Sequence, residues 1–573
     1  MKETKDNIKF NSYKNFIINV FIILAVAIVL SRIQFRVDLT EDNRYTLSDA
    51  TKKIVQNIDE DLYVQVFLDG DMPIALKRMK RSVKDMLDEF KIISKRKIDY
   101  EFINPLEVGD AEQRDAYFMS LYNKGLNPIN IQVNDEEGGK TTKMIFPGML
   151  INYNGAEVPI NILSNNWLSS YEENIQHSIE GLEYELAQTI STVTSDSIYK
   201  VAFIEGEGEL YDIEVADISY SLSRYFTIDR GVIGGKIGVL DDYSAIIIAK
   251  PEFEFTEQDK FVIDQYLMNG GKAVWLVDEV HVSSDTLAAQ GETLAMYQPL
   301  NIEDMLFRYG TRINPEIIQD LECQVIRLSV FTSAEQQQMI STSWIYNPML
   351  VPSPNHPITR NINRIRGEFA NSVDTVGLDP AIKKTILLTS STTAKTVTPP
   401  MMIRYSETEN LPDESQYAKS NIPVAILLEG VFPSAYKNRM TGQYVDDPSY
   451  KVLTESVPTK MIVIGDGDII RNDVEVTSSG GLSPLSLSQD NNTGEPYGNR
   501  DFLVNSINYL VNDNGLMDLR SREVKLRLLD KAKIRNEKLK WQLINVICPI
   551  LIVVLAGIIY NYLRRLKWGK ANQ

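Results

Sequence analysis

The chain has 573 residues, a mass of 65.0 kDa and a formal net charge of -18. This length is too great for one hydrophobic core, so two or three folded domains are expected. The acidic balance argues against a nucleic-acid partner, because such proteins need a basic face to neutralise phosphates. Cys323 and Cys548 lie in dissimilar surroundings and predict neither a disulfide nor a zinc cluster.

The first predicted membrane element is residues 16–35, in which FIINVFIILAVAIVL (Phe16–Leu30) follows a lysine-rich start. This run predicts an uncleaved signal anchor. A cleaved signal peptide is the alternative, because Ala25-Val26-Ala27 resembles a small-x-small cleavage site. The lysines favour a cytoplasmic position for the tail of residues 1–15.

Residues 37–195 predict an outer domain in which helices and strands alternate. Ser48 is expected to cap a first helix that ends at Gln56. The next expected elements are strand 63–68, helix 74–93, strand 98–103, helix 111–122, strands 129–133 and 144–153, and helix 172–193. This order resembles a thioredoxin-like domain. The segment Gly70-Asp71-Met72-Pro73 stands where the redox Cys-x-x-Cys would lie, so thiol chemistry is excluded.

The segment Gly138-Gly139-Lys140-Thr141 ends like a phosphate-binding P-loop, but its spacing does not fit. Asn134 stands where the loop requires its first glycine, and the acidic residues 135–137 would face the phosphate. The segment therefore predicts a hairpin turn, and no ATP binding by this chain is expected. The three histidines are too scattered for a zinc site and are expected at the surface or in loops: His177, His281 and His356.

Residues 197–522 predict a second α/β outer domain. The expected elements are strand 201–204, helix 215–225, strand 245–248, helix 257–268, strand 273–277, and later strands 385–388, 424–428 and 461–464. The alternation of strands and helices over residues 201–277 predicts parallel βαβ units. Thr256 is expected to cap the helix that begins at Glu257. Residues 284–380 give no clear pattern, and the Ser-, Gly-, Asn- and Pro-rich residues 478–498 predict a long mobile loop.

The acidic turn FIEGEGEL directly follows a predicted strand, at the position where open α/β sheets bind ligands. Its Glu205, Glu207 and Glu209, together with Asp466 and Asp468 of the similar IGDGD turn, are candidates for a ligand or for Ca²⁺ or Mg²⁺. The alternative is a glycine turn whose carboxylates are solvated or cap the next helix. We expect no catalytic residue, no bound metal and no cofactor, because no nucleophile elbow or neighbouring histidine accompanies the turn.

The carboxyl-terminal region predicts a second membrane segment. Residues 523–540 are strongly basic and predict a membrane-proximal helix, residues 541–562 are long enough to cross the hydrocarbon core, and residues 563–573 form a basic tail. Two spans would return both termini to the cytoplasm. The basic residues 523–540 oppose this orientation, but they can lie against anionic lipid headgroups.

Three residues of the second span are candidates for contact with the membrane or a partner. Trp541 suits the membrane interface, and Ala556 and Gly557 allow close helix approach.

Several stretches resemble one family. FRVDLTEDNRYTLSDATKK (35–53), GNRDFLVNSINYLVND (498–513) and LKWQLINVICPILIVV (539–554) are similar to the GldG family of gliding-motility-associated ABC transporter auxiliary proteins. IPVAILLEGVF (422–432) and KMIVIGDGDII (460–470) fit the pattern of auxiliary, substrate-binding-like components of ABC transport systems.

The resemblance implies a non-enzymatic, extracytoplasmic component that works with a separate ABC-type permease, a cytoplasmic ATPase and membrane lipid. It places the chain in the bacterial inner membrane, with two spans and a large periplasmic region. Two alternatives remain. The first is an outer module that binds a polysaccharide or peptide, and the second is a carboxylate- or metal-dependent hydrolase.

The fold class that follows is α/β and membrane-anchored. A thioredoxin-like first outer domain precedes a glutamine-amidotransferase-like (flavodoxin-like) α/β domain, with one transmembrane helix at each end. The resemblance implies no amidotransferase activity, because the nucleophilic cysteine is absent and Glu207 stands where related sequences carry a histidine.

Overall fold

The computed structural model describes residues 14, 16–22, 24 and 46–569, apart from 135–139, 164–165, 167–168, 196–198, 332–336, 378, 410–411, 441, 443, 445–449, 479, 513–514 and 522–530. Residues 16–22 are helical, but most of the expected first membrane segment, 16–35, lies outside the described residues. The chain divides into two compact units, residues 1–522 and 523–573, which are treated separately below.

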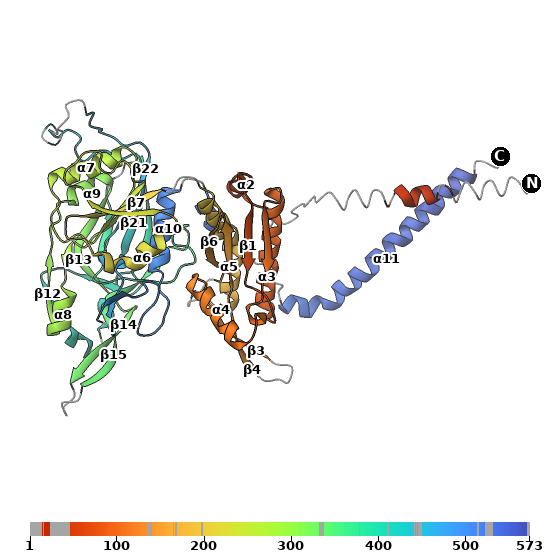
Figure 1. The fold of residues 1–573 in the computed structure, drawn as a ribbon, viewed down its shortest axis with the longest axis horizontal. Helices are drawn as coiled ribbons and strands as arrows, with labels where there is room; N and C mark the ends of the chain where they lie inside the picture. The colour runs from red at the N-terminus through yellow and green to blue at the C-terminus, as the bar shows by residue number, and fades with distance from the viewer. Residues whose placement is uncertain are drawn as a thin grey trace, which may run out of the picture. The chain divides into compact units, whose positions relative to one another are not determined.

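The first unit begins with a four-stranded sheet in the order β2-β1-β5-β6. Figure 1 labels its strands β1 and β6, near helices α3, α4 and α5. Its strands are β1 (Leu62–Val66), β2 (Ile98–Phe102), β5 (Gly148–Tyr153) and β6 (Ala156–Asn161). The β1 and β2 strands are parallel, whereas β5 runs antiparallel to both β1 and β6. The helices are α2 (Asp49–Gln56), α3 (Ile74–Ile93), α4 (Ala111–Asn123) and α5 (Tyr171–Val193). Ser48 caps α2 by accepting the Thr51 N–H, as predicted.

The alternating side chains of this sheet separate two apolar layers. Met149 and Ile151 of β5 belong to the core under α3 and α5, whereas Leu150 between them packs with Phe67 and with Leu121 of α4. Because successive strand side chains point to opposite faces, α3 and α5 cover one face and α4 the other.

The prediction of one strand over 144–153 is wrong. The chain instead forms a hairpin of β3 (Ile129–Asn134) and β4 (Lys140–Ile145), followed by β5 after Phe146 and Pro147. Proline has no N–H to donate to a ladder, so it ends β4. The β3–β4 pairing confirms the predicted hairpin, although residues 135–139 lie outside the described part of the chain.

A ten-stranded mixed sheet follows, in the order β14-β15-β18-β21-β22-β10-β9-β7-β8, with β16 paired to β15. The parallel half contains β7 (Lys200–Glu205), β8 (Thr227–Val232), β9 (Ala245–Ala249), β10 (Ala273–Leu276) and β22 (Thr459–Ile464). The antiparallel half contains β14 (Cys323–Phe331), β15 (Gln337–Pro352), β16 (Ile365–Arg366), β18 (Ile382–Thr389) and β21 (Pro423–Gly430). The prediction of parallel βαβ units over residues 201–277 is confirmed, because β7, β9 and β10 are parallel.

Helices cover both faces of the parallel half. Apolar residues of α6 (Ala216–Leu222) and α10 (Asn499–Val511) share a core with Val201 and Phe203 of β7. Those of α7 (Glu257–Met268) and α9 (Glu303–Tyr309) pack with the alternate residues Ala202 and Ile204. Thr256 accepts the Asp259 N–H and caps α7, as predicted.

Residues 284–380, which gave no clear pattern in the sequence, contribute β14, β15 and β16 to the large sheet and share two small sheets with neighbouring segments. One small sheet has the order β11 (Val280–His281), β12 (Glu292–Tyr297) and β20 (Met401–Arg404). The other has the order β17 (Asn371–Thr375), β13 (Thr311–Asp320) and β19 (Ala394–Val397). Helix α8 (Ser284–Gln290) lies between β11 and β12 in the chain. Short 3₁₀ helices are η1 (Pro105–Glu107), η2 (Asp212–Glu214), η3 (Tyr405–Glu409), η4 (Glu414–Gln416), η5 (Gly467–Ile470) and η6 (Met517–Ser521).

One loop prediction needs correction. Residues 478–498 are not one structureless loop, because β23 (Val474–Val476) pairs with β24 (Leu482–Pro484). Farther on, the Asp490 carboxylate accepts the Tyr497 hydroxyl at 2.6 Å and the Gln324 amide at 3.1 Å. His356 lies in the loop between β15 and β16, as the loop alternative predicted, but its side chain is buried against Tyr509.

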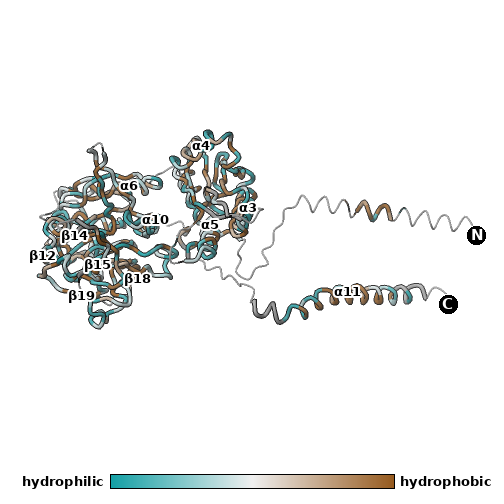
Figure 2. Tube along the Cα trace, turned by 90° about the horizontal axis from the view of Figure 1, so that it is seen from below, coloured by the Kyte–Doolittle hydropathy of each residue, from teal (hydrophilic) through white to brown (hydrophobic). Residues whose placement is uncertain are grey.

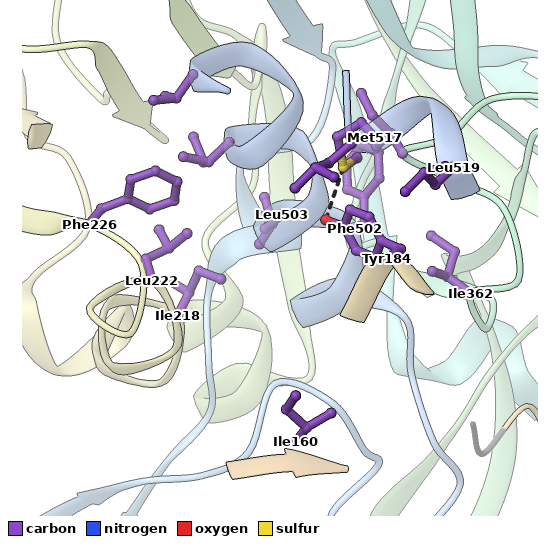
Figure 3. Close-up of a cluster of buried hydrophobic side chains, with 14 of the residues drawn as sticks. Ile160, Tyr184, Ile218, Leu222, Phe226, Ile362, Phe502, Leu503, Met517 and Leu519 are labelled. Atoms are coloured by element: carbon purple, nitrogen blue, oxygen red, sulfur yellow. Dashed lines mark hydrogen bonds between the residues drawn. The ribbon is translucent and has the colours of Figure 1, made fainter. Parts of the chain in front are cut away.

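The smaller and larger sheets of the first unit share one hydrophobic core (Figure 3). Tyr184 of α5 donates its hydroxyl hydrogen bond to the Met517 sulfur at 3.0 Å, beside Phe502 and Leu503 of α10. The Gln188 amide also donates to the Asn508 side chain at 3.2 Å. This shared core predicts that the two sheets unfold together.

The second unit contains one long helix, α11 (Lys531–Gly569). Residues Glu537–Leu563 of this helix are long and apolar enough to cross a membrane (Figure 2). This confirms the apolar helix predicted over residues 541–562. The same helix continues into the basic segment that was expected to precede the span.

Candidate functional site

Charged side chains follow four neighbouring parallel strands where each strand ends. β7 ends in Glu205, Lys250 follows β9, Asp278 lies just beyond β10, and Asp466 lies just beyond β22. The carboxyl ends of parallel strands meet at one edge of a sheet, which is where open α/β folds bind ligands. This edge is therefore the candidate site.

Its centre is a buried ion pair between the Lys250 ammonium and the Asp468 carboxylate. The Lys250 Nζ atom also lies 3.5 Å from an oxygen of Asp278. Arg471 approaches the other Asp468 oxygen at 3.0 Å. One carboxylate thus holds two cations in a place where an unpaired charge would be costly.

Two backbone hydrogen bonds fix the IGDGD turn onto this pair. The Gly467 N–H donates to Asp278 at 2.8 Å, and the Asp468 N–H donates to Asp466 at 2.9 Å. A side chain at position 467 would place its Cβ 2.6 Å from the Lys250 Cγ atom. Glycine is required here by close approach.

The carboxyl groups of this cluster are driven to different protonation states. Burial, followed by the nearby Asp278 and Asp468, raises the pKa of Asp466 well above its ordinary value. Burial raises the pKa of Asp278 to about 6, against the opposing effect of Lys250. Burial acts the same way on Asp468, but Arg471 and Lys250 outweigh it and lower its pKa. Asp468 is therefore the ionised partner and Asp466 the neutral one.

The network continues to helix α10. Arg471 pairs with Glu368 at 3.2 Å, and the Arg366 side chain pairs with Asp473 at 3.1 Å. The fully buried Asn499, the first residue of α10, accepts the Arg366 N–H and donates to its carbonyl, both at 2.9 Å. The cluster therefore anchors the start of this helix to the sheet edge.

The FIEGEGEL turn forms a second, separate group. Glu207 and Glu209 are only 7 % and 9 % exposed, so the expectation of solvated carboxylates is wrong for these two. The Glu207 N–H donates to Glu209 at 2.9 Å. Burial and the carboxylates of Glu209 and Asp259 raise the pKa of Glu207 to about 8, and burial raises that of Glu209. Glu205 instead pairs with Arg230 at 2.7 Å.

The structure does not bring the two turns into one cluster. β10 and β9 lie between β22 and β7, so three strand spacings, roughly 14 Å, separate their ends. Within the described residues, no group of three or more His, Cys, Asp or Glu side chains is arranged to hold a metal. The charged side chains of the Lys250 cluster pair with one another, which suits a structural role in holding the strand ends together.

Sequence reasoning missed Lys250 and Asp278, the residues that connect the strands. A signal for both was present: each follows an apolar strand, AIIIA before Lys250 and AVWLV before Asp278. A charge directly after a buried parallel strand lies at the ligand edge of the sheet and could have been selected on that ground.

The candidate contact residues of the second unit all lie on α11. Trp541 donates its indole N–H to Glu537 at 3.0 Å, near the start of the apolar stretch. A Cβ built at Gly557 would meet no described atom within 4 Å, so this position is open for a neighbouring helix.

Comparison with known proteins decides the family. A family model described as "ABC-type uncharacterized transport system" matches residues 199–506, which are more than half of the chain and include every described strand of the large sheet. The chain belongs to this family of ABC transporter auxiliary proteins. A second model, a domain of unknown function (DUF7088), matches residues 41–152. A transporter-associated accessory role follows from membership.

Individual relatives add less. An uncharacterized protein of Borreliella burgdorferi is 22 % identical over 571 residues and is similar across 98 % of this chain and 99 % of its own length. Among solved structures, the mmIFT52 N-terminal domain is 13 % identical, with a TM-score of 0.30 over 55 % of this chain and 98 % of that one. An exo-β-1,4-mannosidase from Opitutaceae bacterium strain TAV5 is 9 % identical, with a TM-score of 0.19 over 69 % of this chain and 46 % of that one. At these scores neither likeness decides the fold.

Proposed function

We propose that this protein is a non-enzymatic, membrane-anchored auxiliary subunit of an ABC transporter, working with a separate permease and a cytoplasmic ATPase. The observation that carries the proposal is the family match over residues 199–506 in a chain that also holds the apolar helix α11. The P-loop spacing fails at Asn134, so the ATPase is assigned to another chain.

A non-enzymatic role fits the chemistry of the sheet edge. The Lys250, Asp468 and Arg471 charges are satisfied by one another, and the Gly467 turn closes over them. A catalytic site would require an acid, base or nucleophile within reach of a substrate. The cluster instead ties β9, β10 and β22 to α10 and supports a rigid scaffold.

The finer assignments are part of the same proposal. The helix order of the first part favours a thioredoxin-like domain over residues 37–195, and the parallel strands favour an amidotransferase-like domain over 197–522. The apolar run of residues 16–30 favours a first span, with both termini cytoplasmic and the large region periplasmic. The resemblance to GldG supports a role in gliding motility.

The direct test is recovery of the complex from native membranes. The full chain is tagged, extracted with a gentle detergent and purified, and the bound proteins are identified by mass spectrometry. We expect an ABC-type permease and an ATPase in fixed ratio to the chain. Their absence, under conditions in which another membrane complex of the same cells stays intact, would refute the proposal.

A matched pair of variants tests the contact helix. Gly557→Leu adds bulk at the position proposed for close approach, so it should reduce permease recovery at least ~3-fold. Ile550→Leu keeps the volume of an exposed side chain of the same helix and should leave recovery unchanged. Equal recovery in the two variants would remove Gly557 from the interface.

A further inference from the structure

A cavity of about 390 Å³ lies near the carboxyl edge of the large sheet, apart from the Lys250 cluster. Residues of α9 and the start of β13 line it, and Glu279, just beyond β10, joins them. Tyr297 of β12 also contributes to the lining. This volume lies within the range of small-molecule sites.

Glu279 is the unusual residue of this cavity. It is only 5 % exposed, yet among the described residues its carboxylate has no hydrogen-bond or ion-pair partner. Its backbone is held in place, because its N–H donates to Asn371 at 2.7 Å and its carbonyl accepts from Gln298 at 2.9 Å. Buried carboxylates are normally paired, so this one has an unused binding capacity.

Two other acidic side chains of the lining already have ion-pair or hydrogen-bond partners. Asp304 pairs with Lys260 and Arg439 at 2.9 and 2.8 Å, and Glu303 accepts the Leu300 N–H at 2.9 Å. Arg312 lines the cavity but makes no ion pair with Glu279. Among the described residues that line the cavity, Glu279 is therefore the acidic group without a partner, and it becomes negatively charged when it loses its proton.

The remaining lining is apolar or aromatic. Leu306, Ile313 and Pro315 supply aliphatic surface, and Tyr297 and Phe307 supply partly exposed rings. Ring faces attract cations, and aliphatic surface favours an alkyl body. Anions fit poorly, because three carboxylate side chains line the cavity against one guanidinium.

We propose that this cavity binds a small organic amine, with its ammonium group paired to Glu279 and its alkyl body against Leu306 and Phe307. The site is independent of the assembly with a permease. Burial and the carboxylate of Glu303, opposed by Arg312, raise the pKa of Glu279 to about 8. The free carboxyl is thus protonated at neutral pH, and binding of the ammonium group releases its proton.

The probe is n-butylammonium, with n-butanol as the uncharged match, titrated into the full chain in detergent by ligand-observed NMR. We expect a Kd of about 1 mM for the amine, a value within reach of a five-atom ligand. Binding of n-butanol and binding of the amine to Glu279→Gln should both be at least ~10-fold weaker, because each lacks the charge pair.

Two further arms keep the test decisive. Arg312→Gln removes a like charge from an exposed residue and, at about pH 9.5, where Glu279 is already ionised, should tighten amine binding about 3-fold, even if Glu279→Gln fails to fold. Affinity should rise up to about 10-fold per pH unit between pH 6 and 8, with Glu303, Asp304, Arg312 and Tyr297 as the other titratable groups facing Glu279. Equal binding of amine and alcohol, or unchanged binding in Arg312→Gln, overturns the proposal.

Discussion

Lys250 and Asp468 form a buried ion pair although they are 218 positions apart in the chain. The pair joins the end of β9 to the turn after β22, across the intervening β10. Lys250→Met should destabilise the chain by about 3 kcal/mol, because Asp468 and Asp278 would lose their shared cation while buried. Urea unfolding of the full chain in detergent, followed by tryptophan fluorescence, measures this change.

Lys77→Met is the matched control. Lys77 and Asp71 also form an ion pair, at 3.5 Å, but both side chains are exposed. Loss of this surface pair should change the free energy of unfolding by less than about 1 kcal/mol. A similar loss of unfolding free energy in the two variants would show that the buried Lys250 ion pair contributes no more to stability than a surface pair.

The turn after β22 should not tolerate a side chain. Gly467→Ala would press its Cβ against Lys250 and Asp278, at 2.6 and 3.0 Å, and should cost about 2 kcal/mol of stability. At Gly231, in the edge strand β8, a Cβ would meet nothing within 4 Å. Gly231→Ala should therefore leave the free energy of unfolding unchanged. A comparison of the unfolding midpoints of the two variants separates the effect of close packing at Gly467 from the general effect of replacing a glycine.

Glu207 should make the stability of the chain depend on pH. The group ionises near pH 4.5 when unfolded and near 8 when folded, so the folded state keeps an extra proton between these values. Stability attributable to Glu207 is therefore full below pH 4.5 and falls as the pH rises to 8. Glu207→Gln should stabilise the chain by about 2 kcal/mol at pH 8.5 and have little effect at pH 4.

Unfolding curves of the wild type and Glu207→Gln at both pH values measure this difference. Glu475→Gln, at an exposed position of β23, serves as the control and should leave the pH profile unchanged. A Glu207→Gln profile parallel to that of the wild type would contradict the assignment.

Local signals in the sequence were sufficient for helices with clear ends. The helix over 74–93 was predicted with the bounds of α3, and Thr256 marked the start of α7, because apolar spacing and capping are local properties. β8 was missed because its residues are mostly polar or partly exposed at the sheet edge. The antiparallel half of the sheet depends on pairings between distant segments, which no local pattern contains.

The candidate site was also predicted only where local sequence features determine it. Strand ends and glycine turns placed Glu207 and Asp468 at one edge of a sheet, because both features are local. The burial of Glu207 and the pairing of Asp468 with Lys250 depend on loops that close over the edge. The exposed or buried state of a carboxylate is thus a tertiary property, and the expectation of solvated side chains failed for that reason.

The shared core should make the two sheets of the first unit unfold as one. Phe502 of α10 is fully buried in the cluster that also contains Tyr184 of α5 (Figure 3). Phe502→Ala should cost about 3–5 kcal/mol. Hydrogen exchange should then accelerate in α5 as well as α10, whereas Met119→Ala at an exposed position of α4 should change neither. Faster exchange confined to α10 would show that the sheets are energetically separate.

The apolar helix α11 should do more than hold the protein at a membrane. An anchored subunit stays at a high effective concentration beside its partners, and this effect depends only on anchoring. Specific helix packing depends in addition on the side chains of the span, including Ala556 and Gly557. Replacement of Glu537–Leu563 by an unrelated apolar helix of equal length separates the two contributions. We expect the chimaera to remain in the membrane fraction while its recovery of the permease and ATPase falls at least ~10-fold. Unchanged recovery would assign the whole interface to the first unit, because anchoring alone would then suffice.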